Sequence, residues 1–290
     1  MGQTVFEKGS RVMRSQINSS SSGLTFWRSW CERLWNNAES SWITRTGQDH
    51  YNRDEVILPA LKGVLASEAR FCGLVDIGCG DGYTTGALLD SLDNIHARPR
   101  DVLLLDLSKR QLGVALRRPS LAGAHAAIID LETNPRSTQL SLPCHPTVFI
   151  SVFVLQELPS LEPLLAMLAD VLHPEDLGLC VTLAPSFSQR LADRGAITFE
   201  TGHPKTALDW NWAGGFPVPV GGETVYLPHF QRDMKSIIDA YAAHGLTVTA
   251  VKDLCVPDSV EARRIFGGTV YGEDIIDQPS SVLLSVRKTL

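Results

Sequence analysis

The sequence predicts an α/β fold, a doubly wound sheet of seven mostly parallel strands with an N-terminal helical cap and a lid insert. From Phe71 onward, short apolar runs alternate with segments of helical periodicity, which is the pattern of βα units around a parallel sheet. One apolar run leads directly into a glycine-rich turn. A long connection between Leu183 and Gln231 is rich in Gly, Pro and aromatic residues, and such a connection in a compact domain is typical of a functional lid.

The apolar runs define seven strands, and the periodic segments between them define four helices. The strands are expected at Gly73–Ile77, Asp101–Leu105, Ala126–Ile129, Thr147–Val152, Gly178–Leu183, Leu246–Lys252 and Ser281–Arg287. The helices are expected at Tyr83–Ser91, Lys109–Arg117, Leu161–Leu172 and Gln231–His244. Gly245 follows the last helix, where we expect a left-handed residue to cap it.

The chain divides into a flexible tail (1–22), a helical cap (23–67) and an α/β domain (68–290) that contains the lid (185–229). Apolar residues at three- and four-residue steps predict an amphipathic helix with an aromatic face from Leu24 to Ser41. Asn52–Ala66 is expected to form a second helix, interrupted by Pro59, that leads into the core. The aromatic face could roof a pocket or pair with a second subunit, so a homodimer through these helices is one of the two arrangements it allows.

Composition excludes several classes of protein. With 290 residues, 44% apolar and 20% charged, the chain suits one large soluble domain, and it has no apolar run long enough to span a bilayer. A net charge of −6 argues against a nucleic-acid partner, because that affinity depends on Lys and Arg neutralising phosphates. The N-terminus lacks the apolar stretch of a secretory signal, so a cytoplasmic protein is expected. The six cysteines form no C-x-x-C pair, and no carboxylate–histidine cluster has metal-ligand spacing, so no metal is expected.

The glycine-rich turn is the first sign of a ligand site. The segment Leu74–Tyr83 reads L-V-D-I-G-C-G-D-G-Y, a buried strand followed by a turn and a helix. In an open parallel sheet this is where nucleotide-like ligands bind, because glycines let the ligand approach the backbone and the helix N-terminus faces it. The spacing is G-x-G-x-G, which differs from the G-x-G-x-x-G of a dinucleotide pyrophosphate site.

Two carboxylates at the next strand ends narrow the chemical class of the ligand. Asp106 closes the second strand, where a ribose diol is held in nucleotide folds, and Asp130 closes the third, where it could accept from an adenine amino group. Together with Asp76 they would repel a phosphate. The pattern therefore indicates a phosphate-free adenosine that carries a positive charge, although each Asp alone could be an ordinary turn residue.

These features make the chain resemble the class I S-adenosylmethionine-dependent methyltransferases from about Tyr51 to Lys252, and V-D-I-G-C-G-D-G-Y is similar to that family's first motif. The resemblance implies S-adenosylmethionine as cofactor, with S-adenosylhomocysteine as product. It also implies cofactor-binding roles that follow the family's motifs. The methionine end would be held by Asp76, Gly78, Gly80 and the fourth-strand residue Ser151, the ribose by Asp106, and the adenine by Leu107, Asp130 and Leu131. His173–Gly178 departs from the family pattern at a turn.

Methyl transfer from a sulfonium depends mainly on holding a nucleophile in line with the methyl group, and a base is needed only for a protonated acceptor. We expect a small-molecule acceptor of the secondary-metabolite kind, methylated on O, N or C. Its pocket is expected to contain residues from the cap, the fourth strand and the aromatic lid, namely Tyr51, Gln156, Glu157, His203, Trp210 and Tyr226. His229 resembles a histidine that recurs before the post-lid helix in small-molecule members, and it is expected to be an acceptor ligand or general base; otherwise it caps the helix or satisfies a local hydrogen bond.

Three other functions stay open. The same cofactor site could assist a rearrangement, cyclisation or elimination without methyl transfer. A nicotinamide oxidoreductase would use a similar sheet, but the glycine spacing and Asp130 count against it. A non-catalytic partner protein could keep the fold, although the glycine and acidic positions are intact.

Overall fold

The computed structural model describes residues 51–68, 71–92, 99–131, 144–194, 212–220, 223–267 and 275–289, with the side chains of 192, 212–220 and 223–228 left out. The predicted tail, the predicted helix Leu24–Ser41 and the homodimer surface on it lie outside these residues. So do His203 and Trp210. Of the helical cap, only residues 51–67 are described.

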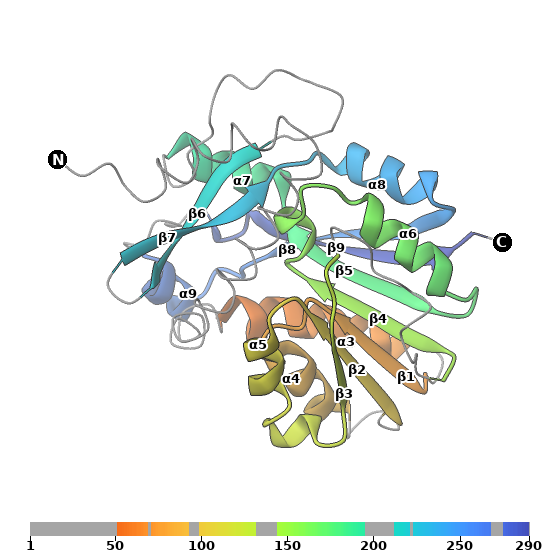
Figure 1. Cartoon of the computed structure of the whole chain (residues 1–290). Helices are drawn as coiled ribbons and strands as arrows, with labels where there is room; N and C mark the ends of the chain where they lie inside the picture. Colours follow the sequence, from red (N-terminus) through yellow and green to blue (C-terminus); the bar gives the residue numbers. More distant parts are fainter. Residues whose placement is uncertain are drawn as a thin grey trace.

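Seven strands form one sheet, as the sequence predicts, and their order is β3-β2-β1-β4-β5-β9-β8 (Figure 1). β3, β2, β1, β4 and β5 pair in parallel, and β9 is antiparallel to both of its neighbours. The bounds are β1 Gly73–Ile77, β2 Asp101–Asp106, β3 His125–Ile128, β4 Thr147–Val152, β5 Leu177–Leu183, β8 Leu246–Cys255 and β9 Pro279–Lys288. A doubly wound, mostly parallel sheet is therefore confirmed.

The register of the parallel strands brings their carboxyl ends to one edge. Ile77 of β1 pairs with Leu105 of β2, and Asp106 pairs with Ile128 of β3. The residue that follows each strand therefore meets the residues that follow its neighbours, since parallel strands end on the same side. The glycine turn, Asp106 and Asp130 share this edge for that reason.

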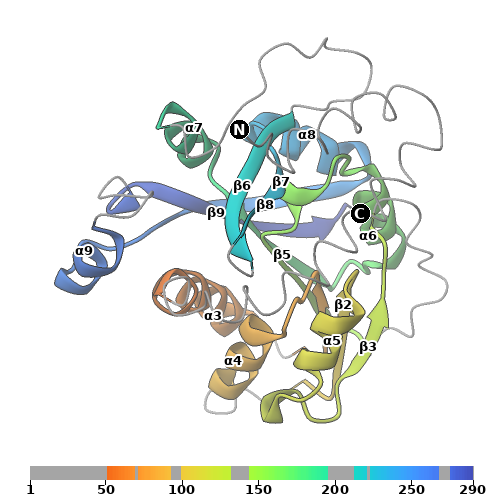
Figure 2. The same ribbon diagram turned by 60° about the vertical axis from the view of Figure 1, so that its left-hand side comes forward.

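Helices cover both faces of the sheet (Figures 1 and 2). α3 packs against α4 on one face, and α6 packs against α8 on the other. The bounds are α3 Leu58–Ser67, α4 Tyr83–Leu92, α5 Lys109–Ala115, α6 Glu162–Val171 and α8 Met234–Ala243. β1, β4 and β5 are buried on both faces, as a parallel sheet requires. Gly245 follows the end of α8, and its φ of +69° confirms the expected left-handed cap.

The second predicted helix is a continuous helical segment with two geometries. Residues Asn52–Ile57 form a π-helical turn (η1) that runs into α3. Pro59 lies in the first turn of α3, next to the change from π to α geometry, and it does not break the segment. Ile57, Leu61 and Leu65 are fully buried, and this segment therefore belongs to the main core.

The predicted lid range contains structure that the sequence did not predict. α7 spans Pro185–Asp193, and an antiparallel hairpin joins β6 (Trp212–Val220) to β7 (Glu223–Phe230), as Figure 2 shows. β7 packs against the short 3₁₀ helix η4 (Leu155–Glu157). β6 contains two prolines and two adjacent glycines, a composition typical of loops, and a two-stranded ribbon tolerates prolines because it has open edges. The sequence also did not predict α9 (Val260–Phe266).

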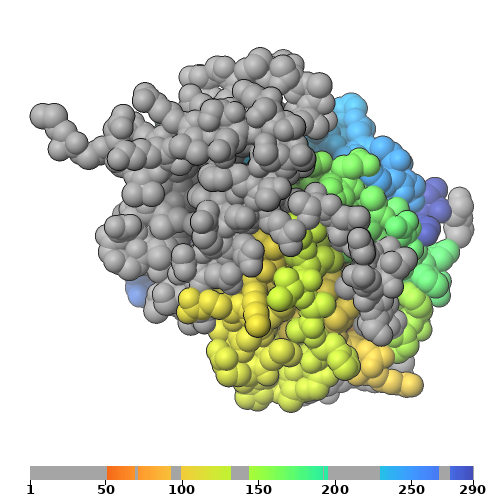
Figure 3. Space-filling view, in the orientation of Figure 1, coloured from red at the N-terminus to blue at the C-terminus, as the bar shows by residue number. Residues whose placement is uncertain are grey.

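The surface near α5 and β3 is the lower part of the face drawn in Figure 3. β3 is the edge strand of the sheet, and its residues His125, Ala126 and Ile128 are exposed.

Among the described helices, none is long and apolar enough to cross a bilayer.

Candidate functional site

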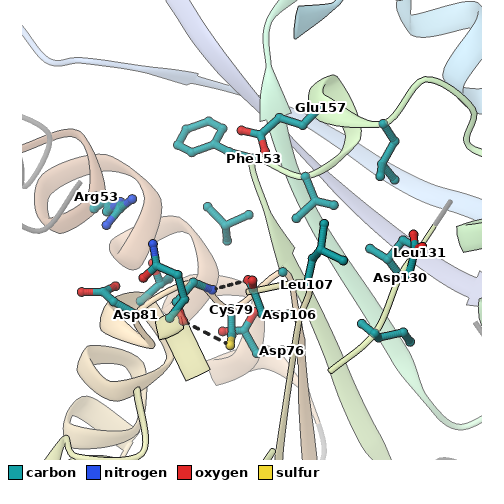
Figure 4. Close-up of a pocket in the computed structure, with 18 residues that line it drawn as sticks. Arg53, Asp76, Cys79, Asp81, Asp106, Leu107, Asp130, Leu131, Phe153 and Glu157 are labelled. Carbon is teal, nitrogen blue, oxygen red and sulfur yellow. Dashed lines mark hydrogen bonds between the residues drawn. The ribbon is translucent and has the colours of Figure 1, made fainter. Parts of the chain in front are cut away.

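The main cavity of the described structure lies at the carboxyl ends of β1 to β4 (Figure 4). Each of these strands contributes the residues that follow it, and η1, α4 and α5 add side chains from the helices next to them. The lining residues are Arg53, Asp76, Gly78, Cys79, Gly80, Asp81, Thr84, Asp106, Leu107, Gln111, Ile129, Asp130, Leu131, Val152, Phe153, Val154, Glu157 and Leu158.

The glycine turn leaves the cavity floor open for a ligand. Gly80 has a φ of +55°, and a Cβ built there would meet no atom of the described residues within 4 Å. A side chain at this position would project into the space that a ligand needs, and the positive φ disfavours any other residue. The turn therefore leaves its backbone open to the cavity, which the predicted close approach of a ligand requires.

Asp106 is fixed by two backbone hydrogen bonds. The N–H of Gly80 donates to Oδ2 and the N–H of Ser108 donates to Oδ1, each at 2.8 Å. Burial raises the pKa of Asp106, and the backbone N–H bonds oppose that shift. Each carboxylate oxygen can accept a second hydrogen bond from a ligand, so Asp106 offers two preorganised acceptors, which is what a vicinal diol needs.

Asp76 is only 3% exposed at the end of β1, and its Oδ2 accepts a hydrogen bond from the Thr85 hydroxyl. Burial raises the pKa of Asp76 to about 7, and the hydrogen bond from Thr85 only partly opposes this shift. A carboxyl group in this state favours a cationic partner, because the added charge offsets the cost of burying the carboxylate.

Arg53 is a cavity residue that the sequence analysis missed. It is 9% exposed on η1, its guanidinium lies 5.9 Å from the centre of the Tyr83 ring, and its charge lowers the pKa of Asp76 after the larger effects of burial, Thr85 and Asp106. Figure 4 shows Arg53 on the opposite side of the cavity from Asp130 and Leu131. An arginine within the apolar helix Asn52–Ala66 was a signal that could have identified it.

The opposite end of the cavity is apolar with polar acceptors beside it. Leu107, Ile129 and Leu131 line it together with Asp130. Gln111 also lines the cavity at 2% exposure, and its Oε1 has no hydrogen-bond partner within the part of the chain that the structure describes. A buried amide oxygen without a partner is costly, so this position suits a flat ligand that donates hydrogen bonds from its edge. Gln111 was also missed, because a single glutamine in a helix carries no motif.

Beyond β4, the backbone turns toward the other wall of the cavity. Phe153 has a φ of +61°, unusual for an aromatic residue, and it lines the cavity with Val152 and Val154. Glu157 of η4 reaches the same wall, where burial raises its pKa well above the ordinary value and the charge of Asp106 adds to the shift. Ser151 is placed elsewhere: it lines a separate apolar cavity with Cys180 and Tyr241.

Gln156 and His229 meet in a second, smaller cavity behind η4. His229 is buried, its Nε2 lies 3.0 Å from Ser188 Oγ, and burial together with the nearby charge of Arg232 lowers its pKa to about 4. Tyr51 does not line the main cavity either. Its hydroxyl lies 3.0 Å from Ser259 Oγ, and its ring contacts Phe266 edge-on.

The structure therefore brings eight of the predicted site residues to one cavity and places four others away from it. The eight are Asp76, Gly78, Gly80, Asp106, Leu107, Asp130, Leu131 and Glu157. Those placed away from its lining are Tyr51, Ser151, Gln156 and His229. Tyr226 lies on β7 and only its backbone is described, and His203 and Trp210 lie outside the described residues.

No protein-family profile matches the sequence, and no curated protein matches it. Solved structures do match. One is an S-adenosylmethionine-dependent methyltransferase from Mesorhizobium loti, at 18% identity and a TM-score of 0.51, with 79% of this chain and 96% of that chain covered. Another S-adenosylmethionine-dependent methyltransferase, from Clostridium acetobutylicum, matches at 12% identity and a TM-score of 0.52, with 83% of this chain and 92% of that chain covered. A magnesium protoporphyrin IX methyltransferase from Synechocystis PCC 6803, with bound S-adenosylhomocysteine, matches at 14% identity and 0.54, with 90% and 99% covered. The chain has the Rossmann-like fold of the class I S-adenosylmethionine-dependent methyltransferases.

Proposed function

We propose that this protein is an S-adenosylmethionine-dependent methyltransferase that transfers a methyl group to O, N or C of a small-molecule acceptor. The observation that carries the proposal is the set of carboxylates at three consecutive strand ends, Asp76, Asp106 and Asp130, which line one cavity beside an open glycine turn. A phosphate group would be repelled there, whereas a cationic adenosine derivative has a partner for each carboxylate.

The residues of the cavity fit the parts of S-adenosylmethionine in order. Asp106 would accept from the ribose hydroxyls, and Asp130 and Gln111 would accept from the adenine edge. At the other end, Arg53 would pair with the carboxylate of the methionine part and Asp76 with its ammonium group. The bound cofactor supplies an activated methyl group, so the chain has to orient the acceptor and keep water out.

A small-molecule acceptor is supported by the net charge of −6, which counts against nucleic acid. The matched structure of a magnesium protoporphyrin IX methyltransferase shows the same fold in a protein named for a small-molecule acceptor. The acceptor roles of Tyr51, Gln156, His203, Trp210, Tyr226 and His229 stay predictions. The place of His229 beside Ser188, behind η4, favours an effect through that segment over contact in the main cavity.

The experiment that tests the cofactor is calorimetric titration of the purified chain with S-adenosylhomocysteine. Asp106→Ala removes two charge-assisted acceptors and is expected to weaken binding on the order of 100-fold. The matched control is Asp101→Ala, an exposed carboxylate at the opposite end of the same strand, which is expected to bind as the parent does. Circular dichroism of both variants confirms that the sheet is intact. Undiminished binding in Asp106→Ala, or no binding by the parent chain, overturns the proposal.

A further inference from the structure

Glu157 is a carboxylate of the main cavity that no part of the proposed cofactor uses. It lies on the wall with Phe153, across the cavity from Asp76 and Asp106 (Figure 4). The cofactor parts assigned above run along the floor, from Arg53 at one end to Asp130 at the other. The wall that contains Glu157 is therefore where an acceptor would approach the reacting group.

The segment that carries Glu157 is held by hydrogen bonds on both sides. Within the segment, Gln156 Nε2 donates to the carbonyl of Phe153 at 2.7 Å. From β5, the Thr182 hydroxyl donates to Gln156 Oε1 at 3.0 Å. These bonds fix the backbone on which Glu157 stands, and a fixed backbone is what a group that touches the reacting atoms needs.

Arg232 adds a second clamp from the base of the β6–β7 hairpin. Its guanidinium donates to the carbonyls of Leu155 at 3.0 Å, Leu158 at 2.6 Å and Pro159 at 2.9 Å. These carbonyls belong to residues before and after Glu157, so the Arg232 guanidinium holds the backbone on both sides of it. Arg232 is thus a positioning residue for Glu157.

The surroundings of Glu157 favour a cationic ligand. Val154, Leu158 and Phe153 make this wall apolar, and a carboxylate in such a place gains most from a partner that brings a positive charge and a hydrogen to donate. Of the charged side chains that line the cavity, Asp76, Asp81, Asp106 and Asp130 are acidic, and Arg53 is basic. Arg118 offsets the charge of Asp81, but Asp76, Asp106 and Asp130 still outnumber Arg53, so the acidic side chains of the lining favour a cation.

We propose that Glu157 binds the acceptor as an ammonium ion and receives its proton during methyl transfer, which makes the acceptor class an amine. This inference rests on the proposed function. In the step, one N–H bond of the ammonium breaks and its proton goes to the Glu157 carboxylate. The freed nitrogen lone pair forms the N–C bond to the methyl group while the C–S bond breaks, and its electron pair stays on sulfur as a neutral thioether. Glu157 then returns the proton to water.

The raised pKa of Glu157 suits this role, because proton transfer from an ammonium is easier when the two groups are closer in pKa.

Two cofactor analogues test this without knowledge of the acceptor. S-Adenosylhomocysteine has a neutral sulfur, whereas sinefungin has an ammonium-bearing carbon in place of the methyl-bearing sulfur and so presents a cation where the acceptor nitrogen would approach. Calorimetric titration gives the dissociation constant of each analogue for the parent chain, Glu157→Gln and Glu175→Gln. Glu175 is exposed at the turn before β5, and its exchange is the matched control.

We expect the parent chain and Glu175→Gln to prefer sinefungin, and Glu157→Gln to lose about tenfold in sinefungin affinity with its S-adenosylhomocysteine affinity unchanged. Glu157→Asp keeps the charge and is expected to retain part of the preference. Equal losses for both analogues in Glu157→Gln, or no loss for either, overturn the inference while the proposed function stands. A parent chain that binds neither analogue overturns both.

Discussion

Asp76 provides a sharp test of how the site is built, because its carboxyl group is buried and the charge of Arg53 opposes the effect of that burial only in part. Its pKa is raised from 3.8 to about 7, mainly by burial. Asp76→Asn removes the ionisation and keeps an oxygen that can accept the hydrogen bond from Thr85. The variant is therefore expected to fold as the parent does and to respond differently to pH.

The size of the pH effect follows from the pKa of Asp76 in the unfolded state, 3.8, and in the folded state, about 7. Between about pH 4 and pH 7, the folded state holds a proton on Asp76 that the unfolded state has lost, so the free energy of unfolding falls as the pH rises. Each pH unit in this window is worth about 1.4 kcal/mol, and the effect levels off above the folded-state pKa. The free energy of unfolding of Asp76→Asn, taken relative to that of the parent, is therefore expected to rise by roughly 2 to 3 kcal/mol between about pH 5 and pH 8.

Urea denaturation followed by circular dichroism at both pH values measures this difference. Other groups titrate in the same range, and their contributions largely cancel when the parent and the variant are compared at each pH. Asp90→Asn makes the same exchange at an exposed position on α4 and controls for the loss of a surface charge. If the gap between Asp76→Asn and the parent does not change with pH, Asp76 is not a buried carboxyl group that ionises near neutrality, and the argument for a cation at this end of the cavity is refuted.

Two further variants test residues that support the site without lining its cavity. Asp176 is fully buried and accepts from the backbone N–H groups of Thr147 and His173, each at 2.7 Å, so Asp176→Asn is expected to lose about 3 kcal/mol of stability in urea denaturation without weakening S-adenosylhomocysteine binding. A loss below 1 kcal/mol would show that this turn does not depend on the carboxylate. Arg232→Gln removes the clamp on the Glu157 segment, and it is expected to reduce the preference for sinefungin over S-adenosylhomocysteine while binding of the latter persists. An unchanged preference would show that Arg232 does not position Glu157.

The part of the fold that the sequence predicts well is the part built from local periodicity. The apolar runs of β1 and β4 coincide with the observed strands, because both strands are buried on both faces and need continuous apolar residues. The β6–β7 hairpin was not predicted, since its prolines and glycines read as a loop and its pairing is a contact between separate segments. Local patterns hold no information about such a contact until the strands meet.

The same division applies to the site. Asp76, Asp106 and Asp130 could be found from the sequence because strand ends of a parallel sheet meet at one edge, so their order along the chain fixes their place in space. Arg53 and Gln111 come from helices, and which face of a helix lines a cavity depends on how it packs on the sheet.

By itself, the sequence determined the doubly wound sheet, the open glycine turn and the carboxylates that line up along the strand ends, since each follows from local periodicity and from the geometry that every parallel sheet shares. Only the tertiary structure decided which side chains complete the cavity. Packing brings Arg53 and Gln111 to the main cavity, and it places His229 and Ser151 in separate cavities. The direction of a side chain at a loop or helix depends on the elements that pack around it, and these come from distant parts of the chain.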